Sequence, residues 1–170
     1  MFGPPFPYPV FYADHILPLM RDNGVKRILA LSTISAVDPE NDKFVWLRWV
    51  LKTVVRFLAP KGYRAMVEIA EVFRGLGQQQ EEQEEGNRVD WTVFRVPGLS
   101  GGVGEEEWRR EREVKGGRVY VGPVGEGWTG WIGRARLARW LVDCVEGVEG
   151  AQGVDAAGKV LRMPAVSDTK

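Results

Sequence analysis

Residues 89 to 96, VDWTVFRV, form a run of strongly β-forming residues that leads directly into Pro97 and Gly98. A second run, VKRILALST at residues 25 to 33, has an ILAL core that is apolar at consecutive positions. Strands that are apolar on both faces are typical of a parallel sheet covered by helices. The two runs therefore predict neighbouring strands of a buried parallel sheet.

Helix-forming segments alternate with these runs and extend along the rest of the chain. We expect helices at residues 13–24, 43–59, 61–77 and 132–147, and further short strands at residues 118–122 and 158–166. Gly24, Pro60, and the pair Gly75 and Gly77 are the expected helix ends. With 170 residues, the chain is predicted to be a single α/β domain. Residues 1–13 are expected to be an irregular lead-in, residues 78–88 an acidic loop, and the final SDTK a frayed tail.

The predicted helix 43–59 is bulky and apolar except for Arg48, Lys52 and Arg56, which recur every four residues and share one stripe. Two interpretations follow. The helix is buried on most faces with one wet edge, which we favour, or it presents a surface to a partner or a membrane interface.

Composition excludes several classes of protein. Lys plus Arg and Asp plus Glu number 23 each, and no basic motif stands out, so nucleic-acid binding is not expected. The single cysteine, Cys144, excludes an internal disulfide, and its apolar helical setting predicts a buried thiol. With one histidine, His15, no metal site is expected. No signal peptide and no membrane span of about 18 apolar residues are expected, so the predicted location is cytoplasmic.

The carboxyl ends of the two strongest strands carry the candidate site, because ligands of open α/β sheets bind there. Ser32 and Thr33 could hydrogen-bond a carbonyl substrate or a cofactor amide, or could cap the next loop. Pro97 and Gly98 could pack a flat ring close to the backbone, or could simply reverse the chain.

Two further residues, Arg95 and Tyr63, each allow two interpretations. Arg95 falls in a buried strand, so it needs either an internal carboxylate such as Glu71, which we favour, or a ligand. Tyr63 opens the helix 61–77, where it is either a phenol donor or a packing residue.

The pair GVKRILALST and VDWTVFRVPGL, with AEVFRGLG before the second, resembles the carboxyl half of the atypical short-chain dehydrogenase/reductase group, the NmrA-like or NAD(P)H-binding proteins. RLARWLVDCVEG and GKVLRMPAV resemble the late helix and final strand of that group, so the resemblance covers about residues 14 to 166. It implies a partial Rossmann-like, doubly wound parallel sheet, NAD or NADP as cofactor, and an oxidoreductase acting on a small carbonyl substrate.

The resemblance also implies roles for particular residues. Ser32 matches the serine that orients the substrate carbonyl, and Tyr63 the catalytic tyrosine of a Tyr-x-x-x-Lys motif. Thr33 and the segment Pro97, Gly98 and Leu99 match the positions that lie against the cofactor. Val67 stands where the motif has lysine, and a tyrosine of pKa about 10 without a nearby cation is a poor acid at neutral pH. The alternative is therefore a non-catalytic module that senses the dinucleotide.

The family's glycine-rich strand-turn-helix, which holds the cofactor pyrophosphate, has no counterpart in this sequence. GLSGGVG (98–104) and GPVGEG (122–127) do not fit that pattern. We therefore expect a sheet that lacks the family's first strands and a truncated or divergent member. Such a chain would have no independent cofactor binding, or would form a homodimer or bind a partner through helix 43–59.

Overall fold

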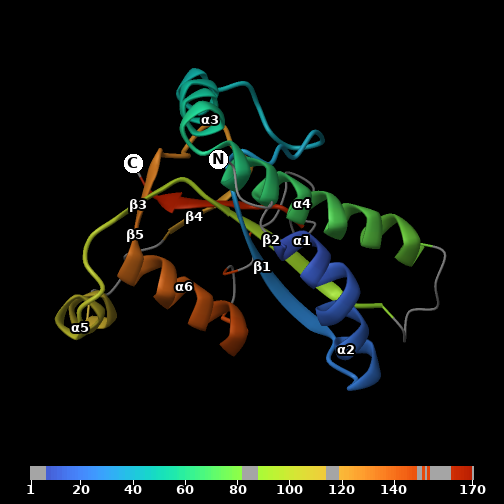
Figure 1. Ribbon diagram of the computed structural model, residues 1–170. Helices are drawn as coiled ribbons and strands as arrows, with labels where there is room; N and C mark the ends of the chain where they lie inside the picture. Colours follow the sequence, from blue (N-terminus) through green and yellow to red (C-terminus); the bar gives the residue numbers. More distant parts are fainter. Residues whose placement is uncertain are drawn as a thin grey trace.

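A computed structural model of the protein describes residues 7–81, 88–113, 119–148, 151, 153 and 162–169. The helices are α1 Tyr8–Phe11, the π-helical turn η1 Tyr12–Ile16, α2 Leu17–Asp22, α3 Trp46–Leu58, α4 Pro60–Glu81, α5 Glu105–Glu113 and α6 Arg134–Glu146 (Figure 1). The strands are β1 Arg27–Thr33, β2 Asp90–Val96, β3 Gly98–Ser100, β4 Val119–Gly122, β5 Trp131–Gly133 and β6 Ala165–Asp168.

The main sheet has the strand order β1-β2-β6-β4. β1 and β2 run parallel in full register, from Arg27 opposite Asp90 to Thr33 opposite Val96. β2 also pairs with β6 in parallel, whereas β4 runs antiparallel to β6. β3 and β5 form a separate two-stranded parallel sheet. The protein is thus an α/β domain with a mainly parallel sheet, consistent with a partial Rossmann-like fold.

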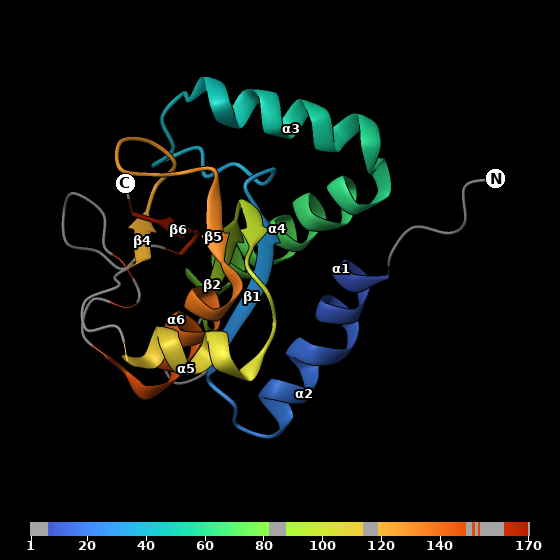
Figure 2. The same ribbon diagram turned by 90° about the vertical axis from the view of Figure 1, so that its left-hand side faces the viewer.

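Helices cover both faces of β2, as its continuous apolar sequence predicts. The amino-terminal helices and α4 lie on one side of β1 and β2, and α6 lies on the other (Figures 1 and 2). Trp91 and Val93 of β2 belong to the core cluster beneath α4, whereas Phe94 packs edge-to-face on Trp140 of α6. The residues of β2 therefore alternate between two buried layers.

Helix α4 continues through Gly75 and Gly77 to Glu81, so the expectation that these glycines end the helix was wrong. A Cβ atom at Gly77 would lie 3.0 Å from the Trp91 ring, which shows that this glycine permits close packing. The first residues of the predicted acidic loop 78–88 are consequently helical, and residues 82–87 lie outside the described residues.

Both ends of the described chain are more ordered than the sequence suggests. Helical structure begins at Tyr8, inside the predicted irregular lead-in 1–13, and Gly24 ends it in a left-handed conformation as expected. At the other end, Ser167 and Asp168 belong to β6, and Ser167 is fully buried. The prediction of a frayed tail was therefore wrong for these two residues, because they pair with β4.

Helix α3 ends just before Pro60, as predicted, but it starts at Trp46 and not at residue 43, and its orientation differs from the interpretation we favoured. Arg48, expected on the wet edge, is only 7% exposed, whereas Trp46 and Phe57 are exposed. The favoured reading of a mostly buried helix with one charged, wet edge was therefore wrong.

Two smaller expectations can be compared with the structure. Cys144 is buried, as predicted, and burial raises the pKa of its thiol to about 11. No helix in the described part of the chain is both long enough and apolar enough to cross a membrane.

Candidate functional site at the rim of strands β1 and β2

The carboxyl ends of β1 and β2 lie side by side. We call this edge, made of residues 32–34 and 96–99, the rim. Thr33 is opposite Val96, and the backbone N–H of Ile34 donates a hydrogen bond to the Val96 carbonyl at 3.2 Å. The expectation that the two strand ends run parallel and meet at one edge is confirmed.

The two hydroxyls predicted at the rim make local hydrogen bonds. Ser32 is fully buried, and its Oγ donates to the backbone carbonyl of Met66 in α4 at 2.7 Å. Thr33 Oγ1 accepts a hydrogen bond from the Ser35 N–H at 3.3 Å, which corresponds to the loop-capping alternative. Ser32 therefore ties β1 to α4, and Thr33 shapes the turn that follows.

The Ser32 contact with α4 lies three residues after Tyr63 on that helix. This separation corresponds to about 4.5 Å along a helix axis. The structure thus brings the amino-terminal part of α4, where Tyr63 is half-buried, to the carboxyl end of β1. Val67 lies about one turn after Tyr63 on α4, at the position where the motif has a lysine.

The glycine at position 98 is explained by a ring that belongs to the protein itself. Gly98 is opposite Trp131 in the β3–β5 pair, and its N–H donates to the Gly130 carbonyl at 3.0 Å. A Cβ atom at this position would lie 2.3 Å from carbon atoms of the Trp131 ring. Strand β2 runs into Pro97 and Gly98 because the backbone passes directly against this indole. Leu99, the next residue, is exposed.

Beneath the rim lies a buried ion cluster of Arg95, Asp42 and Arg48. Arg95 is fully buried; its Nη2 donates to Asp42 Oδ1 at 2.8 Å and its Nε donates to the Met163 carbonyl at 2.7 Å. Arg48 Nη1 donates to Asp42 Oδ2 at 2.8 Å. The ion pair predicted for Arg95 exists, but the choice of Glu71 as its partner was wrong.

Glu71 could not serve because it points away from β2. It pairs with Arg74, three residues later on the same helix, and is largely exposed. Asp42 ends the turn DPEND at residues 38–42 and is 53 residues from Arg95. The turn is recognisable in the sequence, but nothing in it shows which of its acidic residues faces inward.

Burial and the neighbouring charges shift the pKa values of Asp42 and Arg48. Burial opposes ionisation of Asp42, but the hydrogen bonds and positive charge of Arg95, together with the N–H groups of Asp38 and Val124, keep its pKa below the usual value. Burial lowers the pKa of Arg48, with Asp42 attracting and Arg95 repelling its charge. A carboxylate that is paired with two guanidinium groups stays ionised near neutral pH, so Asp42 stabilises the fold and does not act as a proton donor.

The surroundings of the two glycine-rich segments do not suit the phosphates of a dinucleotide. GLSGGVG leads into α5, but the first turn of α5 carries Glu105, Glu106 and Glu107. The N–H of Gly102, in the loop before α5, donates to Glu107 Oε1 at 3.1 Å, so a carboxylate already lies against this loop. GPVGEG lies between β4 and β5 and precedes no helix. Neither segment fits an anionic phosphate group.

Among the described residues, neither glycine-rich segment therefore supplies a cradle for phosphate groups. The described residues also contain no group of three or more His, Cys, Asp or Glu side chains arranged to hold a metal ion.

Comparison with known proteins adds one structural likeness. No protein-family model matches the chain, and no curated protein matches its sequence. Among solved structures, the chain is similar to one described as a "putative NAD-dependent epimerase/dehydratase" from Bacillus halodurans, with 18% sequence identity and a TM-score of 0.48. The likeness covers 93% of this chain and 53% of the other, so this chain spans about half the length of that protein.

Proposed function

We propose that the chain is an NAD(P)-binding protein of the atypical short-chain dehydrogenase/reductase type, with the ring end of the cofactor at the rim. The observation that carries this proposal is the parallel pairing of β1 and β2, which brings Thr33 and Val96 together at one edge of the sheet. In open α/β sheets, this edge is where ligands bind. The sequence resemblance assigns the same edge to the nicotinamide.

Thr33, Pro97, Gly98 and Leu99 are the residues proposed to contact the cofactor. The side chain of Leu99 is exposed, and the exposed ring of Trp131 lies against Gly98. Both are suited to covering a planar ring. Because the described residues lack a phosphate cradle, we expect weak binding, with a dissociation constant on the order of 1 mM. The substrate and the choice between NAD and NADP stay unassigned.

A second candidate is a non-catalytic, dinucleotide-sensing module. The resemblance assigns Ser32 and Tyr63 to the chemistry of a carbonyl substrate, but Ser32 Oγ is buried and donates to the Met66 carbonyl. Val67 also replaces the lysine that would lower the pKa of a catalytic tyrosine. These two observations favour binding without hydride transfer.

Calorimetric titration of the protein with NADH and NADPH tests the proposal. We expect binding that is weakened at least fivefold by Leu99→Asp, because a carboxylate at the rim repels the anionic cofactor. Val145→Asp, which changes an exposed valine on the last turn of α6, is the matched control and should bind normally. Absence of binding at millimolar cofactor would contradict both candidates.

Hydride-transfer assays then separate the two candidates. If the protein is an oxidoreductase, Tyr63→Phe and Ser32→Ala should each reduce turnover at least tenfold. Unfolding curves of both variants are the control, because Ser32→Ala also removes the hydrogen bond to Met66. Turnover that neither substitution affects would contradict the catalytic assignment, and binding without turnover supports the sensing module.

A further inference from the structure

Helix α3 stands apart from the sheet and exposes apolar side chains. It crosses one end of the molecule, above β1 and α4 (Figure 2). Trp46 is 67% exposed and Phe57 is 78% exposed, and Trp49 is exposed between them. Contiguous apolar surface of this kind on a water-soluble domain marks an interaction site.

These exposed residues share one face of the helix. At 100° per residue, Phe57 lies within about 20° of Trp46 around the helix axis, and Trp49 lies within about 60°. Val54 extends the same face, about 80° to the other side of Trp46. The face therefore runs the whole length of α3. We call Trp46, Trp49, Val54 and Phe57 the outward face.

A buried arginine fixes the outward face in this orientation. Arg48 lies about 160° from Trp46 around the helix. Its Nε donates to the Ile34 carbonyl at 2.9 Å, its Nη2 donates to the Ala36 carbonyl at 3.0 Å, and its Nη1 bonds to Asp42. Rotating α3 to bury its aromatic side chains would break all three hydrogen bonds. The apolar face is thus held outward by the same cluster that anchors Arg95.

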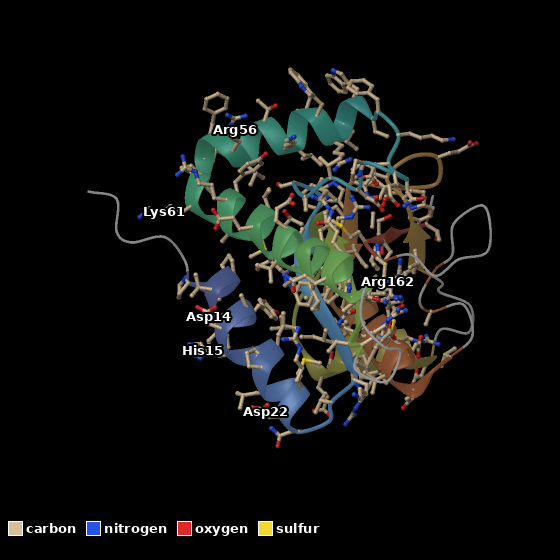
Figure 3. The ribbon with its side chains drawn as sticks, turned by 90° about the vertical axis from the view of Figure 1, so that its right-hand side faces the viewer. Asp14, His15, Asp22, Arg56, Lys61 and Arg162 are labelled. Atoms are coloured by element: carbon tan, nitrogen blue, oxygen red, sulfur yellow. The ribbon has the colours of Figure 1, made fainter. Side chains whose placement is uncertain are left out.

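The charges beside the outward face are all positive. The segment from residue 43 to residue 67 contains no Asp or Glu and six basic residues, of which Arg48 is buried and paired with Asp42 and five remain, in a chain whose formal net charge is zero. Arg56 and Arg64 are exposed, and Lys52 is half-buried on the flank of α3. Figure 3 shows Arg56 and Lys61 near the junction of α3 and α4, whereas Asp14 and Asp22 lie along the amino-terminal helices.

This combination identifies the chemistry of the partner. Tryptophan and phenylalanine beside basic side chains suit the interface of an anionic bilayer, where rings enter the headgroup region and cations meet phosphate and carboxylate groups. A second copy docked face to face would bring like charges together. With 13 residues, about 20 Å, α3 is too short to cross a hydrocarbon core of about 30 Å.

We propose that the outward face of α3 binds the surface of anionic lipid membranes, with the helix lying in the plane of the interface. This inference does not depend on the proposed cofactor binding. It makes the protein a peripheral membrane-binding module.

Co-sedimentation of the full chain with vesicles tests this proposal. We expect binding to vesicles containing phosphatidylserine and at least tenfold weaker binding to pure phosphatidylcholine. Phe57→Asp should weaken binding to the anionic vesicles at least tenfold, and Arg56→Glu at least threefold. Val145→Asp, which adds the same charge at an exposed valine of α6, should bind like the wild type. High salt should also weaken binding, because charge attraction is screened.

The opposing results are equally definite. No sedimentation with phosphatidylserine vesicles, or equal sedimentation of the wild type and Phe57→Asp, overturns the proposal. Light scattering in the absence of lipid tests the competing occupant. A wild-type dimer that Phe57→Asp converts to a monomer, without vesicle binding by either, assigns the face to a second copy of the chain. Circular dichroism of each variant checks that it is folded.

Discussion

Asp42 neutralises two buried arginine side chains that come from different parts of the chain. Arg95 is on β2, Arg48 is on α3, and Asp42 lies in the loop between β1 and α3. Asp42 Oδ1 also accepts a hydrogen bond from the Val124 N–H at 2.9 Å. One carboxylate thus connects strand β2, helix α3 and the loop after β4.

We expect Asp42→Asn to destabilise the protein by about 3 kcal/mol, because it leaves two buried guanidinium groups without their counter-ion. The measurement is urea unfolding. Glu71→Gln is the matched control, since it removes a carboxylate from an exposed pair with Arg74 and should cost less than about 1 kcal/mol. Equal losses for the two variants would show that burial adds nothing to the Asp42 pairs.

The acid sensitivity of the fold should also depend on Asp42. Its pKa is lowered in the folded protein, so the ionised form contributes stability above its unfolded pKa of about 3.9. That contribution is lost as the pH falls through the lower folded value. The free energy of unfolding should therefore fall less steeply below about pH 5 in Asp42→Asn than in the wild type. Parallel pH profiles would contradict this assignment.

Gly98 offers a test of the contact with Trp131. Gly98→Ala places a methyl group where the ring now lies, so the ring must move, and we expect a loss of about 1 to 2 kcal/mol. The indole fluorescence should change with it. Gly98→Ala should cost less stability in the Trp131→Ala background than in the wild type, because the ring is then absent. Equal costs in the two backgrounds would contradict a steric cause.

At the scale of elements, the two strongest strands were easier to predict than helix ends. The last predicted strand, residues 158–166, was less accurate, because β6 is Ala165–Asp168 and residues 162–164 are not in a strand. The apolar runs at residues 25–33 and 89–96 both formed strands. β2 is buried on both faces, as its sequence predicts, whereas Leu31 of β1 is 43% exposed. Glycines misled the prediction for α4, since packing decided their effect. Gly75 faces open space, and Gly77 faces the Trp91 ring.

This difference predicts opposite effects of one substitution at the two sites. Gly75→Ala should stabilise the protein by about 0.5 to 1 kcal/mol, because alanine favours the helix and meets no neighbour. Gly77→Ala should bring little or no gain, because its Cβ would press on Trp91. Thermal unfolding of the two variants measures the difference, and equal gains would show that Trp91 yields without cost.

The orientation of α3 illustrates why element faces are hard to predict. The spacing of Arg48, Lys52 and Arg56 indicated one charged stripe, and charged stripes usually face water. Arg48 instead satisfies backbone carbonyls and Asp42 inside the domain. A periodic pattern defines the faces of a helix, but only the groups packed against it decide which face is buried.

At the scale of the whole molecule, β1 is an edge strand of the sheet in the described part of the chain. Leu31, on this strand, is 43% exposed. An uncovered edge strand is a template for pairing with another chain. Within the described residues, β1 therefore has a paired strand on one side only.

We expect the protein to self-associate at high concentration through β1 and Leu31→Lys to reduce that association, because a lysine on an edge strand opposes edge-to-edge pairing. Light scattering over a concentration series measures the effect. Leu19→Lys, at an exposed leucine of α2, is the control. If both variants associate like the wild type, β1 is not the contact.

The sequence by itself determined that this chain forms two adjacent parallel strands with helices around them, because local β-forming and helix-forming preferences agree with the apolar pattern of both runs. It also indicated that a buried arginine in β2 needs a partner, either an internal carboxylate or a ligand. Only the tertiary structure decided that Asp42 is that carboxylate, that Trp131 is the ring against Gly98, and that α3 turns its aromatic face outward. Each of these depends on contacts between residues far apart in the chain, and such contacts are set by packing in three dimensions.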